Sequence, residues 1–485
     1  MPIELRDYYL LSPQISMVGV AMMLIVADLF ISKKGILPIL AIFLLGLPLG
    51  FTISLWGVDE TAFGGILTVD QFGLFFNVLF IGVVMAVVLA SQETVTRFKN
   101  FQGEYYALIL LATSGLMLLP STAELITIFL ALELSALSSI ALVAFFKNQR
   151  SVEAGVKFLV LSGVSSAMML YGMAMVFGVT GSTDIEGIAQ AIPVTRLLDN
   201  PALLVGVLFM VVGFGFKISS FPFQMWVPDV YQGAPTPVAA FLAVASKAAG
   251  FAVILRVFYI AFGDVSADWS MLFAVLAIIS MSVGNFAAMF QNNIKRLLAY
   301  SAIAHAGYIM IGLAAVSSRV PGGEAIGPQG VLFYLAGYAF TTLAAFFVVI
   351  AIAYRVKSFA IDDFAGMAKR SPLLAALFAI VLISLIGFPP TVGFWSKLYL
   401  FSGAVQAEMV WLAVAGAINS VISAYYYLRV IKVMYLREAT SDEPVRASAP
   451  LGVAIALTTA GVVFFGIAPW FLLDFAIRAT NGFAN

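Results

Sequence analysis

Four ionisable side chains lie in the middle of long apolar runs: Glu133, Lys217, Lys247 and Lys397. An ionised group at the centre of a membrane helix costs about 2.5–3.5 kcal/mol on insertion scales, so such residues mark candidate functional sites. Burial favours a neutral lysine and a nearby carboxylate favours a charged one, so moving the carboxylate can make the lysine exchange a proton. Three lysines with one carboxylate favour a proton relay over a sodium site, which would need clustered oxygen ligands. The alternative is that the charges only hold helices together.

His305 is the only histidine and also lies within an apolar segment. Imidazole takes up and releases a proton near neutral pH, which makes His305 a fifth candidate for the relay. The alternative is a hydrogen-bonded packing residue. Lys157, near the start of its apolar run, is either a relay residue or an anchor that reaches the membrane surface. Asp229 is expected to cap a helix or order a loop.

The composition requires a membrane environment for these residues. Of 485 residues, 62% are hydrophobic and 10% charged, against about 45–50% and about 25% in soluble domains. The 25 basic and 25 acidic residues balance, which argues against nucleic-acid binding. With no cysteine and one histidine, the chain cannot build thiolate iron–sulfur sites, disulfides or a multi-histidine metal site. Redox chemistry is therefore not expected in this chain.

The apolar runs predict an all-α polytopic membrane protein. A helix that crosses the hydrocarbon layer needs about 20 apolar residues. Fourteen runs qualify, near residues 15–32, 36–54, 70–91, 105–119, 122–145, 153–178, 202–222, 235–260, 270–288, 297–317, 329–354, 373–403, 409–434 and 449–475.

Loop charges predict the orientation. Fourteen basic residues fall in one set of loops and four in the other, so the positive-inside rule places both termini outside. Lys33-Lys34 directly follows the first run in place of a small-residue cleavage site, so that run is expected to be a retained helix and not a signal peptide.

A short internal sequence similarity predicts a repeat of five helices. Phe221-Pro222 and Leu255-Arg256-Val257 recur as Phe388-Pro389 and Leu428-Arg429-Val430. Because five is odd, the second copy must be inverted in the membrane, and each Phe-Pro would break a helix. Broken helices at matching positions of inverted halves are typical of an ion or substrate path near the midplane.

The repeat also divides the chain and relates two candidate residues. We expect N-terminal helices over 1–119, a conducting core of two inverted repeats over 120–440, and a C-terminal helix over 441–485. His305 then lies near the place in the second half that Glu133 holds in the first. Small residues around Lys247 predict a face that points into the bundle: Ala239, Ala240, Ala243 and Gly250.

The segment 216–242, continuing to Ser246-Lys247, closely resembles the antiporter-like membrane subunits of respiratory complex I, the proton-translocating NADH:quinone oxidoreductase. Within that family it looks most like subunit N. The resemblance implies that Glu133 and Lys217 form the coupled pair of the first half-channel, that Lys247 is the central relay and that Lys397 is the exit-side lysine. A lysine at position 397 favours N over sibling M, which usually has glutamate there. Gln224 departs from the family, which commonly has histidine at that place.

The resemblance implies a proton-translocating subunit of the bacterial inner membrane with no cofactor of its own. NADH, FMN, iron–sulfur clusters and quinone are expected in partner subunits, and the expected neighbours are subunit M, the small subunit K, the lateral helix of subunit L, and lipid. Two alternatives remain open at this point. One is a subunit of a multi-subunit cation/proton antiporter, and the other is a scaffold that transports nothing.

Overall fold

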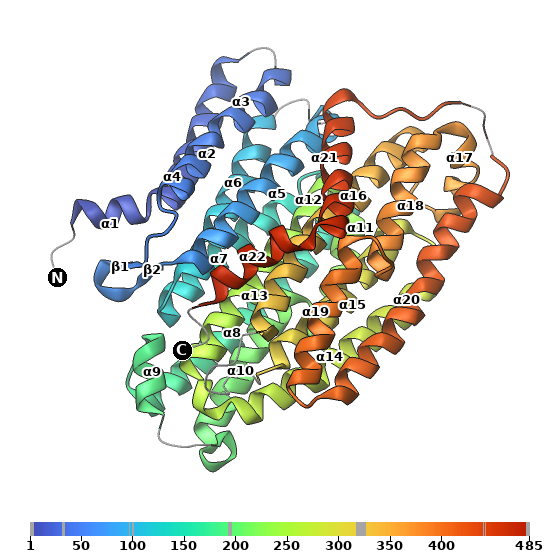
Figure 1. Ribbon diagram of the computed structural model, residues 1–485. Coiled ribbons are helices and arrows are strands. Elements are labelled where there is room, and N and C mark those ends of the chain that lie inside the picture. Colours follow the sequence, from blue (N-terminus) through green and yellow to red (C-terminus); the bar gives the residue numbers. More distant parts are fainter. Residues whose placement is uncertain are drawn as a thin grey trace.

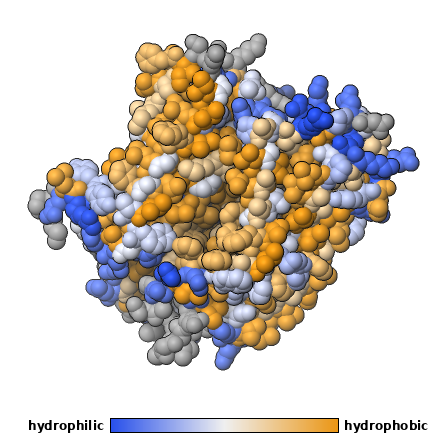
Figure 2. Space-filling view, turned by 45° about the horizontal axis from the view of Figure 1, so that its top comes forward, coloured by the Kyte–Doolittle hydropathy of each residue, from blue (hydrophilic) through white to orange (hydrophobic). Residues whose placement is uncertain are grey.

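The protein is a bundle of long helices (Figure 1). The computed structural model describes residues 4–31, 34–96, 98, 101–192, 196–316, 326–439, 441 and 443–481. The basic residues Lys33, Arg97, Lys99 and Arg319, which entered the orientation count, lie outside these ranges. Hydrophobic side chains cover much of the face in Figure 2, as a lipid-facing surface requires.

Thirteen helical stretches in the described ranges are long and apolar enough to cross a membrane. In chain order they are α2 (Ser12–Phe30), the stretch Lys34–Ser54 with α3 (Leu37–Leu44) and α4 (Gly46–Ser54), α5 (Gln71–Val95), α6 (Gln102–Leu118) with its extension to Ser121, α7 (Leu125–Val143), α8 (Gln149–Thr180), α10 (Pro201–Ile218), the stretch Thr236–Ala261, α14 (Ser266–Met289, within Gly263–Met289), α15 (Ile294–Ala314), α16 (Ile326–Val356), α20 (Val410–Leu436) and α21 (Ala449–Ile467). Two shorter helices, α18 (Pro372–Ile386) and α19 (Val392–Gln406), lie where the sequence predicts the remaining run, 373–403. The polytopic all-α fold is confirmed.

Both expected breaks are present. α10 ends at Ile218 and the chain resumes as α11 (Trp226–Gly233), while a short loop separates α18 from α19. Ser219 and Gly387, the C-cap residues, have left-handed backbone conformations with φ of 67° and 92°, which ends a helix. Each break also contains a cis X–Pro bond, Phe221–Pro222 and Pro389–Pro390. The seventh crossing therefore stops four residues before the expected end at 222.

The internal repeat is visible in matching details of the two halves. The longest helices, α8 with 32 residues and α16 with 31, are the sixth and eleventh crossings. An isolated antiparallel bridge joins Glu124 to Asp184 in one half, and another joins Asn293 to Ala360 about 170 residues later. Glu124 and Asn293 also cap the helices that follow them, α7 and α15. The equivalent helices are five crossings apart, so they run in opposite directions.

The central crossing combines four helical pieces. α12 (Thr236–Phe241) and α13 (Lys247–Arg256) alternate with π-helical turns η5 (Leu242–Ser246) and η6 (Val257–Ala261). Its most apolar part is completely buried inside the protein. The expectation that the small residues beside Lys247 face the interior is confirmed, since all four are buried.

The C-terminal crossing is shorter than the expected 449–475. α21 ends at Ile467, and α22 (Pro469–Thr480) turns away from it across the face of the bundle (Figure 1). Pro469 has no backbone N–H and its ring clashes with the preceding turn, so a straight helix cannot continue through it.

The remaining elements are short. A two-stranded antiparallel hairpin, β1 (Glu60–Ala62) and β2 (Leu67–Val69), is joined to α1 (Leu5–Leu10) by an ion pair between Arg6 and Glu60 at 2.7 Å. The others are α9 (Ile185–Ala191), α17 (Met367–Arg370) and the 3₁₀ turns η1 (Lys34–Ile36), η2 (Phe63–Gly65), η3 (Leu119–Ser121), η4 (Leu197–Asp199), η7 (Gly263–Val265) and η9 (Ile361–Phe364).

Candidate functional site

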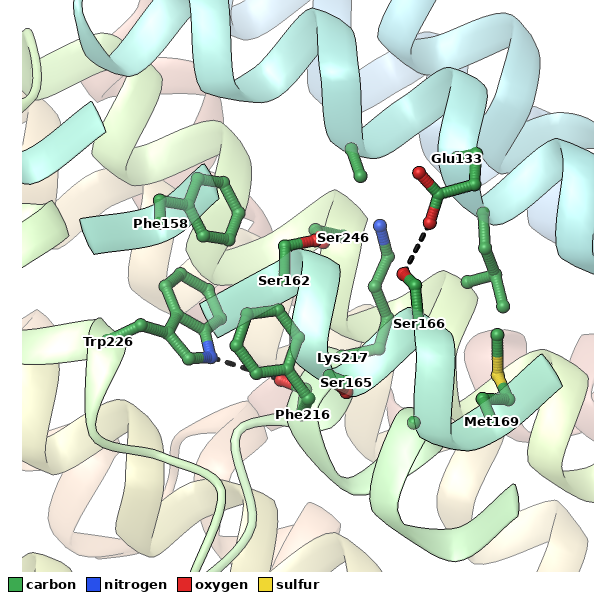
Figure 3. A pocket seen from close by; sticks show the side chains of 13 residues that line it. Glu133, Phe158, Ser162, Ser165, Ser166, Met169, Phe216, Lys217, Trp226 and Ser246 are labelled. Carbon is green, nitrogen blue, oxygen red and sulfur yellow. Dashed lines mark hydrogen bonds between the residues drawn. The ribbon is translucent and has the colours of Figure 1, made fainter. Parts of the chain in front are cut away.

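Glu133 and Lys217 line one small cavity between α7, α8 and α10 (Figure 3). The cavity measures about 30 Å³. A water needs about 10–15 Å³ by this measure, so there is room for about two. Serines 162, 165, 166 and 246 contribute to the lining. The cavity is thus polar enough to hold water between the acid and the lysine.

The two charged groups have separate hydrogen-bond partners within this cavity. Glu133 Oε1 accepts a hydrogen bond from the hydroxyl of Ser166 on α8. Lys217 Nζ donates to Ser135 Oγ at 2.7 Å. Among the described residues, no ion pair joins Glu133 to Lys217. The structure therefore brings the predicted pair to one cavity without direct contact.

Local sequence explains where Lys217 lies. It belongs to the last turn of α10, where backbone carbonyl groups lack intrahelical partners and the helix dipole favours a cation. Gly250 lets α13 approach this end closely, since a Cβ there would lie 3.2 Å from Lys217 Cγ and 2.7 Å from Ile218 Cγ2. A larger residue at position 250 would push the two helices apart.

Lys247 follows directly after the π-helical turn η5, and its side chain is only 1% exposed. Such turns are frequent at functional sites because they reorient one side chain within a helix. Its ammonium donates a hydrogen bond to the backbone carbonyl of Ala302 on α15 and lies 5.6 Å from the centre of the Tyr338 ring on α16. The neighbouring Ser246 lines the cavity of Glu133 and Lys217. Lys247 therefore follows a residue of that cavity in the chain, while its ammonium contacts α15 and α16 of the second half.

His305 and Lys397 line a second cavity of about 10 Å³, with room for about one water. His305 is 4% exposed. Its Nδ1 lies 2.6 Å from the Tyr334 hydroxyl and its Nε2 lies 3.3 Å from the Tyr427 hydroxyl. Both ring nitrogens therefore have hydrogen-bond partners, which fits a packing residue as well as a relay residue. The shared cavity with Lys397 favours the relay role.

Lys397 caps the first half of the broken helix. Its Nζ donates to the backbone carbonyls of Leu385 at 3.2 Å and Ile386 at 2.7 Å, the last two residues of α18, and to Ser420 Oγ at 2.8 Å. These carbonyls have no intrahelical partner, and the negative end of the helix dipole stabilises a cation there. The break in the helix therefore creates the binding place for this buried charge.

Tyr338 joins the two regions. Its ring faces the ammonium of Lys247 and lies 5.1 Å from the His305 ring, and Tyr338 also lines the cavity of His305 and Lys397. Four of the five predicted residues therefore fall into two cavities, Glu133 and Lys217 in the first and His305 and Lys397 in the second. Lys247 lies next to one lining residue of each cavity, Ser246 and Tyr338.

Sequence reasoning missed a further buried lysine. Lys295, counted among loop residues, is 2% exposed and donates to the backbone carbonyls of Gln232 at 3.1 Å and Ala234 at 2.7 Å, where α11 ends. The packing of α15 against α11 and the ring of Phe359, 5.0 Å from its ammonium, bury it. The helix cap by Asn293 was a local signal that Lys295 lies inside a helix.

Asp229 is an ion-pair residue, more than the cap or loop residue expected. Its carboxylate pairs with Lys157 and Arg296, both at 2.8 Å, and Lys157 also pairs with Glu153 at 2.7 Å. A cavity of about 200 Å³ lies beside this cluster, lined by Arg150, Glu153, Lys157 and Asp229 among others. The cluster ties α11 to α8 and α15.

Metal ligands are not grouped in the described part of the chain, where no three His, Cys, Asp or Glu side chains lie close enough to hold an ion. The fold and the site together define a polytopic helical membrane protein with two inverted halves and a set of buried or half-buried ionisable groups in its interior.

Comparison with known proteins identifies the family of this chain. Residues 122–423 match the family described as "NADH:quinone oxidoreductase/Mrp antiporter, TM". The NADH-quinone oxidoreductase subunit N of Dehalococcoides mccartyi is 43% identical over 481 residues, covering 97% of this chain and 99% of that protein. Subunit N of Trichlorobacter lovleyi is 41% identical over 472 residues, covering 96% and 95%.

Solved structures agree. A chain of respiratory complex I from Thermus thermophilus superposes with a TM-score of 0.80 at 30% identity, over 95% of this chain and 98% of that one. A chain of the Mrp complex from Dietzia has a TM-score of 0.85 over 100% and 98%, but at 19% identity it supports the fold alone. The protein belongs to the family of NADH-quinone oxidoreductase subunit N.

Proposed function

We propose that the chain carries protons across the membrane through the line formed by Glu133, Lys217, Lys247, His305 and Lys397. The observation that carries this proposal is a pair of shared cavities: Glu133, Lys217 and Ser246 line one, and His305, Tyr338 and Lys397 line the other. Lys247, the residue after Ser246, lies 5.6 Å from the centre of the Tyr338 ring. The conducting part would be residues 120–440, with 1–119 and 441–485 as flanking helices.

The transfer steps use the groups as follows. The carboxylate of Glu133 stabilises a proton on Lys217 across the water-sized cavity, and a change in their separation releases that proton toward Lys247. Lys247 in its neutral form accepts it and passes it past Tyr338 to His305, whose imidazole can both take and give a proton. Lys397, held at the end of α18, delivers it to the opposite side. Each lysine works only if it can lose its charge, which burial makes possible.

The energy would come from partner subunits. The relatives are named as subunits of an NADH-quinone oxidoreductase, so NADH, FMN, iron–sulfur clusters and quinone are expected in other chains. The expected neighbours are the sibling antiporter-like subunit M, the small subunit K and the lateral helix of subunit L. The location would be the bacterial inner membrane, with both termini outside.

The two alternatives have less support. A role in an Mrp-type cation/proton antiporter draws on a likeness of fold at 19% identity, whereas the relatives at about 40% identity are named subunit N. A pure scaffold needs no water-sized cavities beside its buried charges.

The deciding experiment measures NADH-driven proton uptake into proteoliposomes that contain the assembled complex. Lys247→Ala should lower proton uptake per NADH oxidised while the complex still assembles. The matched control is Lys432→Ala, which removes an exposed lysine and should leave uptake unchanged. Normal uptake with Lys247→Ala would overturn the relay and favour the scaffold.

A further inference from the structure

A wide apolar groove lies on the surface of the bundle, and its lining shares no residue with the two cavities of the candidate relay. It measures about 410 Å³ and is bordered by α5, α16, α21 and α22, with Trp56 at one edge. Thr458 is the only side chain of its lining that carries a hydroxyl, and the other lining residues are apolar or aromatic. The hydrophobic face in Figure 2 is hollowed near its middle. The groove therefore suits a hydrocarbon occupant.

A polar cavity of about 240 Å³ adjoins one end of the groove. α5 contributes Phe72 to the polar cavity and Phe75 to the groove, and α22 contributes Arg478 and Phe475 in the same way. Residues three apart lie on the same face of a helix, about 4.5 Å apart along its axis. Both α5 and α22 therefore line the polar cavity and, one turn away, the groove. The two cavities form one long site with a charged end and an apolar end.

The polar cavity has one positive and one negative side chain that can bind a ligand. The charge of Arg256 is already paired, since its Nη2 donates to both carboxylate oxygens of Asp70 at 3.0 and 2.8 Å and its guanidinium lies 5.0 Å from the Phe72 ring centre. Arg478 and Asp59 also line this cavity and are exposed. Within the described ranges, neither of these two takes part in an ion pair.

We propose that this site binds one phosphatidylethanolamine molecule, with an acyl chain in the groove, the phosphate at Arg478 and the ammonium at Asp59. The zwitterionic headgroup matches both charges, whereas an anionic lipid would leave Asp59 facing negative charge. Along α5 the groove runs from Phe75 to Leu89, about 21 Å at 1.5 Å per residue. This exceeds the roughly 15 Å of hydrocarbon in one leaflet, so the groove can hold a whole chain.

Trp56 indicates the depth in the membrane at which the lipid headgroup would lie. It lies three residues before Asp59, and its ring packs edge-on against Phe475 with centroids 5.9 Å apart. Tryptophan favours the boundary between hydrocarbon and headgroups. The boundary would therefore fall between Phe475, in the groove, and Arg478, in the polar cavity.

The test uses the full chain, purified in mild detergent with the subunits that accompany it, and equal amounts of added phosphatidylethanolamine and phosphatidylglycerol. Bound lipid is identified by native mass spectrometry. Gly82 lines the groove and has open space around it, so Gly82→Phe should fill the groove. Bound phosphatidylethanolamine should fall about tenfold, because the ring displaces several methylene groups. Gly50→Phe is the matched control, since Gly50 is also exposed and open but lies outside the groove.

A second variant tests the headgroup. Asp59→Lys gives the polar end two available positive charges and should shift the preference from phosphatidylethanolamine to phosphatidylglycerol. Equal retention of both lipids in all variants would mean an adventitious additive only. Loss of an accompanying subunit with Gly82→Phe, without any change in bound lipid, would assign the groove to a partner helix. Either result would overturn the proposal and leave the proton relay untouched.

Discussion

The ammonium of Lys217 lies 2.7 Å from the hydroxyl oxygen of Ser135, two residues along α7 from Glu133. The lysine is therefore held beside the carboxylate, in the same cavity, by a neutral group. A bond to a neutral hydroxyl is weaker than one to a carboxylate, so it can be exchanged for a closer approach to Glu133 without breaking an ion pair.

Glu133 and Lys217 should behave as one unit in proton transfer. Glu133→Gln removes the negative charge that stabilises the protonated lysine, so adding Lys217→Ala should cost little more. A double-mutant cycle on the pumping rate of the assembled complex should give a coupling of about 1 kcal/mol or more. Fully additive losses in activation free energy would mean that the residues act independently.

Replacement of Lys217 or Lys247 should show whether the protein needs only the positive charge or also a side chain that can release a proton. Lys217→Ala and Lys247→Ala should lower pumping while assembly persists. Lys217→Arg and Lys247→Arg should rescue poorly, because arginine stays protonated in proteins and cannot pass the proton on. Proton uptake and subunit content are measured on the same preparations. Full rescue by arginine would show that only the positive charge is needed.

Substitutions of Lys397 should separate its role in stability from its role in proton transfer. Lys397→Ala leaves the carbonyls of Leu385 and Ile386 without their cation, which should cost about 1–3 kcal/mol of stability and lower the thermal midpoint of the complex. Lys397→Arg should restore much of the midpoint but little of the pumping. Ser420→Ala removes the hydroxyl that contacts Lys397 and the Ile386 carbonyl but leaves both carbonyl bonds to Lys397 in place, so it should change the midpoint less than Lys397→Ala.

Labelling of single cysteines should fix the orientation. The chain has no cysteine of its own, and Gln149 and Thr61 are exposed. A membrane-impermeant maleimide added to intact cells should label Thr61→Cys and spare Gln149→Cys until the membrane is opened. Strong labelling at position 149 in intact cells would reverse the assignment that both termini face outside.

The contact between α1 and the hairpin should depend on pH. The hydrogen bond from Arg6 lowers the pKa of the Glu60 carboxyl. The contact should therefore be fully present above the ordinary carboxyl pKa and be lost as pH falls through the lowered value. Amide exchange in β1 is the measurement, with Glu60→Gln as reference. The two proteins should differ at neutral pH and converge in acid, and a constant difference at all pH values would contradict the ion pair.

Some features of the protein were determined by the sequence alone. The thirteen long crossings of the described ranges follow from local composition, because each must supply its own run of apolar residues and satisfy its own backbone groups. The breaks near Pro222 and Pro389 follow from local chemistry as well, since proline lacks the N–H that a helix interior needs. The candidate charges Glu133, Lys217, Lys247 and Lys397 were equally clear, because the cost of a charge in hydrocarbon is a property of each residue in its apolar run.

The tertiary structure decided which groups meet. Nothing local indicates that Lys217 bonds to Ser135, 82 residues away, or that Lys295 is buried against the end of α11. The turn of α22 away from α21 and the polar cavity beside the apolar groove likewise depend on how distant helices pack. Contacts between helices arise from shape and small-residue spacing on several faces at once, and a single sequence does not specify which faces come together.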